Sequence, residues 1–138
     1  MTTIVALVLA LVPKFGPTGG AATFPDLSPG VSWELAEHRA RTISELRYEI
    51  RLSVPRERTA PILGHERVRL HLSDASSPLV LDFRQPAEHI QEVRVGAEPV
   101  DYDVVNGHIV VPAAALREGE NTLEIAFVAG DEALNRSD

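Results

Sequence analysis

The sequence predicts an all-β protein, an antiparallel β-sandwich of about seven strands with one short helix before the first strand. Two observations predict this class. Most of the chain after position 43 alternates apolar and polar residues with a period of two, which is typical of half-buried antiparallel strands. The alternating segments are short and are separated by turn signals, with no helical pattern of the length that βαβ units need. A chain of 138 residues has room for one domain with a single core.

Composition and charge exclude several classes of function. A formal charge of -7 and a pI near 5.2, without any cluster of basic residues, argue against binding to nucleic acid. The absence of cysteine excludes disulfides, thiolate nucleophiles and cysteine-based metal sites. Apolar residues make up 44% and charged residues 24% of the chain, which is the composition of a protein that folds.

The first 22 residues are expected to form a signal peptide. Residues 4–12 are an apolar run (IVALVLALV) too short to span a bilayer, and small residues follow at 20–22, where a cleavage site would lie. The alternatives are an uncleaved membrane anchor and a buried or mis-started segment, and the signal peptide and the anchor both place the protein outside the cytoplasm. Residues 23–31 are expected to form a linker, and residues 32–138 the β domain.

The domain is expected to open with a helix and two paired strands. Ser32 is a candidate N-cap for a helix that runs to about Thr42, with Leu35, Ala36 and Ala40 facing the body of the protein. From residue 46 to residue 54 apolar and polar residues alternate, which predicts a long, half-buried strand. A second strand over residues 67–72 is expected to pair with the first.

The remaining strands are expected in an order that suits a meander, at residues 79–83, 90–95, 100–105, 108–111 and 123–127. Asn106-Gly107 predicts a tight hairpin, because both central residues of a type I′ turn need a positive φ. One helical turn is expected over residues 112–116.

One string resembles a protease signature. His65-Glu66-Arg67-Val68-Arg69 matches the zinc motif His-Glu-x-x-His except at its last position, where Arg69 replaces the histidine. The motif needs a helix, on which residues four apart project toward one ion, whereas four residues of a strand span ~13 Å. The segment alternates like a strand. We therefore expect a solvated strand face with His65, Arg67 and Arg69 pointing outward, and no zinc site.

The other histidines give no metal site either. His65 and His71 lie ~20 Å apart along one predicted strand, so they cannot share an ion locally. His38, His89 and His108 fall in a helix, a loop edge and a hairpin, and we expect all of these histidines to be polar surface residues. The chain also lacks a G-x-S-x-G elbow and a glycine-rich phosphate loop. We predict no catalytic, cofactor-binding or metal-binding residue in this chain.

The order of short motifs from residue 36 to residue 138 carries a family resemblance. The motifs are AEHRA at 36–40, LRYEIRL at 46–52, VRLHL at 68–72, LVLDF at 79–83, VRVG at 93–96, NGHIVVP at 106–112, LREG at 116–119, NTLEIAF at 121–127, AG at 129–130 and LNRSD at 134–138. Together, in this order, they resemble the amino-terminal β domain of the aminopeptidase N family of zinc metallopeptidases.

The resemblance implies both a fold and a role. In that family this domain is a saddle-like β structure that packs against a thermolysin-like zinc domain and helps to wall off the active-site cavity. The family's zinc ligands, and the residue that grips the substrate's free amino group, come after the point that matches Asp138, so no functional residue carries over. The resemblance implies a fragment that ends before the catalytic domain. The zinc and the peptide substrates would then belong to that missing domain of the same polypeptide, which removes amino-terminal residues from peptides.

Two hypotheses about the surface follow. A face built for packing within a longer chain is uncovered when its partner is missing, so we expect an apolar patch where the catalytic domain would dock. The alternative is a stand-alone secreted β-sandwich that acts as a binding or adhesion module. A sugar-binding module normally needs exposed aromatic faces, yet aromatic residues make up only 5% of the chain. The one tryptophan, Trp33, is expected to pack under the domain.

Overall fold

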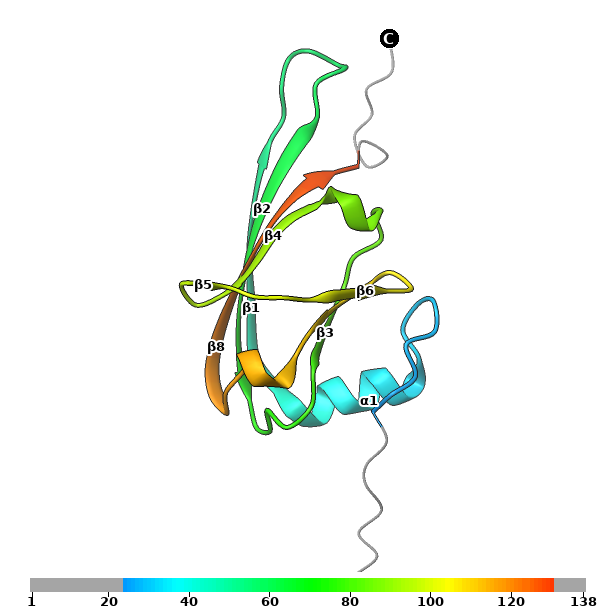
Figure 1. The fold of residues 1–138 in the computed structure, drawn as a ribbon, viewed down its shortest axis with the longest axis vertical. Coiled ribbons are helices and arrows are strands. Elements are labelled where there is room, and N and C mark those ends of the chain that lie inside the picture. Colours follow the sequence, from blue (N-terminus) through cyan, green and yellow to red (C-terminus); the bar gives the residue numbers. More distant parts are fainter. Residues whose placement is uncertain (1–23, 131–138) are drawn as a thin grey trace, which may run out of the picture.

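The computed structural model describes residues 24–130, which form two antiparallel sheets packed face to face, with one helix at their lower end (Figure 1). The large sheet has the strand order β1-β2-β8-β4-β5 and the small sheet the order β3-β7-β6. The elements are α1 (Trp33–Thr42), β1 (Ile43–Ser53), β2 (Ile62–Leu72), β3 (Leu79–Asp82), η1 (Ala87–His89), β4 (Ile90–Val95), β5 (Glu98–Pro99), β6 (Asp103–Val105), β7 (His108–Val111), η2 (Ala113–Ala115) and β8 (Gly119–Ala129). The predicted all-β antiparallel sandwich, with a short helix before the first strand, is confirmed.

The order of strands in the large sheet differs from the predicted meander. β8 lies between β2 and β4, so the last described strand occupies the centre of the sheet. It pairs with β2 along all 11 residues from Gly119 to Ala129, and it buries Leu123 and Ile125. A long strand with a buried apolar face is best placed where neighbours on both sides satisfy its backbone groups. The structure also contains a strand that was not predicted, β5. It has two residues and pairs antiparallel with the end of β4 across the turn at Gly96.

The Asn106-Gly107 hairpin is confirmed. It joins β6 to β7, whose residues Val105 and His108 face each other across the turn. Asn106 has φ 49° and Gly107 has φ 85°, so both central residues have the positive φ that a type I′ turn requires. The local sequence alone therefore determined this turn.

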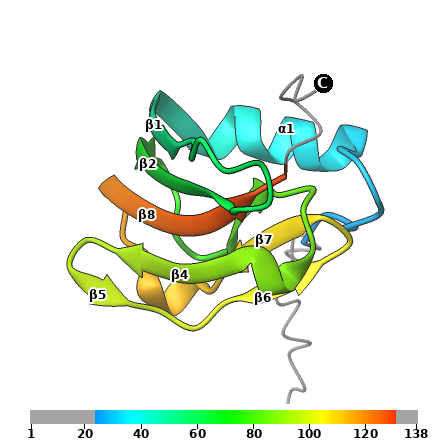
Figure 2. The ribbon, with the colours of Figure 1, turned by 90° about the horizontal axis from the view of Figure 1, so that it is seen from above.

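The view from above shows the two sheets as facing layers (Figure 2), and the buried side chains of the hydrophobic core come from both of them. Both layers contribute fully buried aliphatic side chains. They include Val68 and Leu70 of β2, Val93 of β4, Leu123 and Ile125 of β8, and Ile109 and Val111 of β7. α1 adds only Leu35, so the core is a sheet-on-sheet core, and the helix closes one end of it.

The predicted linker runs against the small sheet. The amide of Asn106 donates a hydrogen bond to the Leu27 carbonyl oxygen at 2.8 Å, and Nε2 of His108 lies 3.3 Å from the Ser28 carbonyl oxygen. The rings of Phe24 and His38 meet edge to face. The predicted signal peptide, residues 1–22, lies outside the described residues. Within residues 24–130 no helix has the length and apolarity needed to cross a membrane.

Candidate functional site

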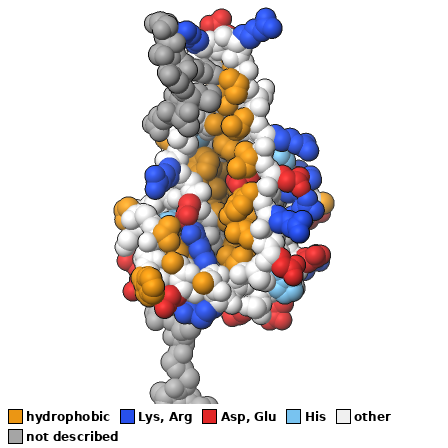
Figure 3. All heavy atoms as spheres, turned by 180° about the vertical axis from the view of Figure 1, so that it is seen from behind, with side chains coloured by type: hydrophobic (Ala, Val, Ile, Leu, Met, Phe, Trp, Pro, Cys, Tyr) orange, Lys and Arg blue, Asp and Glu red, His pale blue; other side chains and the backbone are white. Residues whose placement is uncertain are grey.

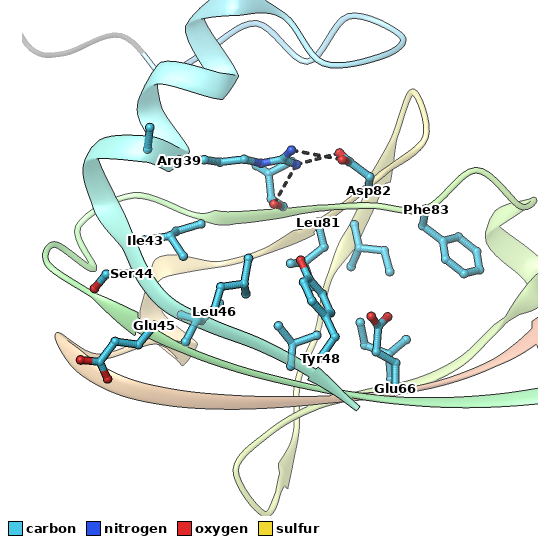
Figure 4. A pocket seen from close by; sticks show the side chains of 16 residues that line it. Arg39, Ile43, Ser44, Glu45, Leu46, Tyr48, Glu66, Leu81, Asp82 and Phe83 are labelled. Carbon is cyan, nitrogen blue, oxygen red and sulfur yellow. Dashed lines mark hydrogen bonds and ion pairs between the residues drawn. The ribbon is translucent and has the colours of Figure 1, made fainter. Parts of the chain in front are cut away.

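An open groove lies between β1 and β3, which are the edge strands of the large and the small sheet (Figure 4). The groove has a volume of about 440 Å³, and Arg39 of α1 lines one side of it. Its floor consists of side chains that also belong to the core, namely Val68, Leu70, Ile109 and Ile125. The sandwich is therefore open along one side, where it exposes part of its own interior.

One wall of the groove is an apolar row that continues along β1 and just beyond its end. We call Leu46, Tyr48, Ile50, Leu52 and Val54 the β1 stripe. These five side chains are between 45% and 59% exposed, and the hydrophobic side chains seen from behind run up the length of the molecule (Figure 3). The described residues thus carry an apolar face of the kind that we hypothesised.

The prediction that this strand is half-buried is wrong for the β1 stripe. Within residues 24–130, β1 has a neighbouring strand on one edge only, and the strands of the small sheet contain three or four residues each. The β1–β2 hairpin extends past that small sheet (Figure 1). Alternation in the sequence marks which face of β1 is apolar, but it does not say whether a second layer covers that face.

Glu66 of β2 is a charged residue that lines the groove beside the apolar side chains of its floor. It is opposite Ile50 in β1 and Ile125 in β8, so its carboxylate projects from an apolar row, close to the Tyr48 side chain (Figure 4). Burial raises the pKa of the Glu66 carboxyl. Burial, and after it the charge of Glu66, raises the pKa of the Tyr48 hydroxyl. No side chain among residues 24–130 forms an ion pair or hydrogen bond with the Glu66 carboxylate.

The sequence patterns did not single out Glu66 as a feature of a site, because it lies within the His65 to Arg69 string that resembles a zinc motif. The signal was present, however, because Glu66 occupies an apolar row of β2 that also contains Val68 and Leu70. A charge in such a row marks either a buried polar contact or a surface made to meet a partner.

A polar cluster lies at the α1 end of the groove. The guanidinium of Arg39 donates two hydrogen bonds to the Asp82 carboxylate, at 2.7 and 3.1 Å, and a third to the Val80 carbonyl oxygen at 3.0 Å. Nδ1 of His108 lies 3.0 Å from the same carboxylate. The hydrogen bonds from Arg39 are the main reason why the pKa of Asp82 is lowered. These contacts join α1, β3 and β7.

The expectation that every histidine is a surface residue is wrong for His108. Its side chain is only 2% exposed, because it lies between Asp82 and the segment that contains Ser28. An aspartate and a histidine in contact resemble part of a catalytic triad. The atom opposite Nε2, however, is the Ser28 carbonyl oxygen rather than a hydroxyl group, so the pair has no nucleophile there. It holds the chain before α1 in place.

The string that resembles a zinc motif forms a strand, as predicted. Glu124 of β8 accepts a hydrogen bond from Arg67 at 2.7 Å and lies 3.7 Å from Nε2 of His65. Arg69 contacts Glu49 on the same face. These ion pairs lie on the opposite face of the sheet from the core. Among residues 24–130 no three His, Asp or Glu side chains gather as metal ligands.

The prediction that Trp33 packs under the domain is also wrong. Its side chain is 73% exposed, whereas Leu35 is fully buried. Residues two apart on a helix are separated by about 200° around its axis, so a helix that buries Leu35 turns Trp33 away from the protein. Ala36 and Ala40 are exposed as well, although both were expected to face the body.

The described residues therefore form one continuous surface feature. It combines a long apolar row, a groove that opens onto the core and the Glu66 carboxylate, which has no ion pair or hydrogen bond within residues 24–130. An exposed apolar surface of this extent is typical of a site that another polypeptide covers.

Comparisons with known proteins support the fold. No protein-family model and no curated protein matches the chain. Among solved structures, the chain is similar to leukotriene A4 hydrolase from Saccharomyces cerevisiae, with a TM-score of 0.53 and 23% sequence identity. The match covers 69% of this chain and 16% of that chain, so the likeness concerns a small part of a much larger protein.

Proposed function

We propose that this chain is the amino-terminal β domain of a zinc aminopeptidase of the aminopeptidase N type, and that it is a structural, non-catalytic part of that enzyme. The observation that carries the proposal is the fold likeness to leukotriene A4 hydrolase, a member of that enzyme family. The order of motifs between residues 36 and 138 supports the same assignment from the sequence.

The chemistry of peptide hydrolysis is not assigned to this chain. The residues present do not fit zinc, since the His65 to Arg69 string is a strand whose side chains alternate between two faces. The proposal places the zinc, the water that it activates and the peptide substrates in a catalytic domain of the same polypeptide. Nucleic acid is not a proposed partner.

The groove and the β1 stripe are the surface that we assign to the catalytic domain. Five apolar side chains in one row, each about half exposed, form a surface that gains stability when another layer covers it. In that position the domain would help to wall off the active-site cavity of the enzyme.

The first test is the DNA sequence that follows codon 138. An in-frame His-Glu-x-x-His, with a glutamate about one helix later, would support the proposal. A stop codon followed by an unrelated gene would overturn it and would favour the stand-alone binding module.

The second test places a charge on the β1 stripe of the complete polypeptide. We expect Leu52→Asp to reduce the hydrolysis of an aminoacyl p-nitroanilide at least tenfold, because a second carboxylate would be buried at the domain interface beside Glu66. Ser53→Asp puts the same side chain on the opposite face of the same strand and should leave the activity within about twofold. Equal activity of the two variants would show that the stripe is not the interface.

One observation favours the alternative, a secreted binding or adhesion module. Trp33 and Val31 are both more than half exposed at the start of α1, and an exposed tryptophan can stack on a sugar ring. Because Trp33 is the only tryptophan, its fluorescence reports directly on such binding. Our proposal expects no change when soluble polysaccharides are added, and saturable quenching would support the alternative.

We also propose that the protein is exported, to the periplasm, the extracellular space or the outer side of a membrane. The proposal rests on the apolar run at residues 4–12 and on the small residues that follow it. A fusion of residues 1–31 to an alkaline phosphatase without its own signal should be active outside the cytoplasm. Phosphatase that stays in the cytoplasm and remains inactive would contradict export.

A further inference from the structure

Four strand edges border the two sheets, and they differ in how well they are protected. β5 and β6 are edge strands of two and three residues. The edge of β3 is covered in part, because Arg39 donates a hydrogen bond to the Val80 carbonyl oxygen at 3.0 Å. β1 is the remaining edge, and it is 11 residues long.

The backbone edge of β1 is open along most of its length, and its charged side chains, Arg47, Glu49 and Arg51, lie on the face opposite the β1 stripe. Its one irregularity is a bulge between Ser44 and Arg47, where Glu45 has φ 52°. From Arg47 to Ser53 the pairing with β2 is regular and contains no proline. Every second backbone N–H and C=O of this segment points away from β2, and no strand among residues 24–130 lies on that side. Such an edge is a template for another strand.

The side chains beside this edge define what an added strand must carry. Its alternate side chains would lie next to the β1 stripe, so most of them must be apolar. Glu66 lies on β2, two strand spacings or about 10 Å from a strand added beside β1. The side chain of an arginine or lysine on the added strand can reach across this distance. A strand that covered Glu66 with apolar side chains alone would bury a carboxylate without a partner, which is unfavourable.

We propose that β1 accepts one extended polypeptide segment as an additional antiparallel or parallel strand, with apolar residues at alternate positions and a single arginine or lysine that pairs with Glu66. The segment closes the groove between β1 and β3. The inference rests on the proposed function in one respect only, namely that the added segment would come from the polypeptide of the catalytic domain. The chemistry of the segment follows from the groove itself.

A second copy of this chain is a poorer occupant. If β1 paired with β1 of another molecule, the β1 stripe of one molecule would lie beside the β1 stripe of the other. All side chains of the β1 stripe are uncharged. Glu66 of each molecule would then lose water without gaining a cation. The proposal therefore commits to a different segment, and self-association becomes an outcome of the test.

The test uses the full chain and short peptides of known sequence. The probe is an acetylated, fluorescent peptide in which threonine alternates with valine and one valine is replaced by arginine. A matched probe carries norleucine in place of the arginine. We expect the arginine peptide to bind roughly tenfold more tightly, measured by fluorescence anisotropy. Glu66→Gln should abolish the preference, whereas Glu49→Gln, on the opposite face of the same sheet, should keep it.

Hydrogen exchange supplies a second measurement that does not depend on any variant. With the arginine peptide bound, every second amide between Arg47 and Ser53 should become protected, and a peptide with a central proline should protect none. Equal binding of the two probes would overturn the pairing with Glu66. Protection elsewhere, or nowhere, would overturn strand addition.

Protection of β1 that grows with protein concentration in the absence of peptide would identify a second copy as the occupant and overturn the proposal. None of these outcomes depends on a zinc domain. Failure here is therefore distinguishable from failure of the proposed function, which the DNA downstream of codon 138 decides.

Discussion

At the scale of single residues, Asp82 holds the polar end of the groove together. Its carboxylate accepts two hydrogen bonds from Arg39 of α1 and contacts His108 of β7. Three elements that are distant in the sequence thus meet at one side chain. Because this side chain is still 49% exposed, its contribution to stability is that of a partly solvated ion pair rather than a buried one.

We expect Asp82→Asn to lower the free energy of unfolding by about 1 kcal/mol at pH 7, measured by urea denaturation. The hydrogen bonds from Arg39 lower the pKa of Asp82 in the folded protein. A carboxyl whose pKa is lowered on folding contributes stability that is present above its unfolded pKa, near 4, and is lost as the pH falls through its folded pKa. The difference between the two proteins should therefore shrink below about pH 4.

The control is Asp103→Asn, which changes an exposed aspartate of the β6 strand. It should change the free energy of unfolding by less than about 0.5 kcal/mol at any pH. If Asp82→Asn behaved like this control, the cluster around Asp82 would have no measurable role in stability.

At the scale of the elements, the packing between β2 and β8 depends on a glycine. A Cβ atom on Gly64 of β2 would lie 2.4 Å from the ring of Phe127, the residue opposite it in β8. The ring of Phe127 also packs edge to face against Phe83, so it cannot simply move away. The absence of a side chain on Gly64 therefore leaves the space that the Phe127 ring occupies.

We predict that Gly64→Ala lowers the free energy of unfolding by about 1 to 3 kcal/mol through this overlap. The double variant Gly64→Ala with Phe127→Leu removes the ring and should be more stable than the sum of the two single effects predicts. Strictly additive effects in thermal or urea denaturation would show that the two side chains do not compete for the same space.

The helix offers a matched pair of substitutions in its first turn. Leu35→Ala removes a fully buried side chain and should cost about 2 to 4 kcal/mol of unfolding free energy. Trp33→Ala, two residues earlier, removes a larger side chain that is 73% exposed and should cost less than about 0.5 kcal/mol. A large loss for Trp33→Ala in the isolated chain would mean that Trp33 packs against the protein after all.

At the scale of the whole molecule, stability should be unequal across the large sheet. β8 and β2 each have neighbours on both sides, whereas β1 has one. Native-state hydrogen exchange should therefore find the slowest amides in β2 and β8. Every second amide between residues 47 and 53 should exchange at least about tenfold faster. Uniform protection along β1 in a dilute sample would contradict an open edge.

Much of the fold could be predicted from the sequence because the relevant signals are local. Alternation with a period of two marked the long strands, and Asn106-Gly107 marked the hairpin. Ser32 marked the start of α1, where its Oγ accepts a hydrogen bond from the Leu35 N–H at 3.1 Å. Each of these features depends on neighbours within a few residues along the chain.

The candidate site was harder to predict because it depends on distant parts of the chain. The alternation in β1 showed an apolar face, and the resemblance to a domain of a larger enzyme led us to expect an uncovered apolar patch. Neither showed how far a second sheet would cover that face. β8 takes the place beside β2, so β3 belongs to the small sheet, whose short strands leave the β1 stripe exposed.

Local patterns in the sequence were enough to predict an all-β sandwich with a helix before its first strand. The packing of the sheets was needed to show that the β1 stripe is exposed, that Glu66 beside it has no ion pair or hydrogen bond within residues 24–130, and that His108 is buried. Periodicity assigns a side chain to a face, but exposure depends on which layer covers that face. The layers are set by contacts between strands far apart in the sequence.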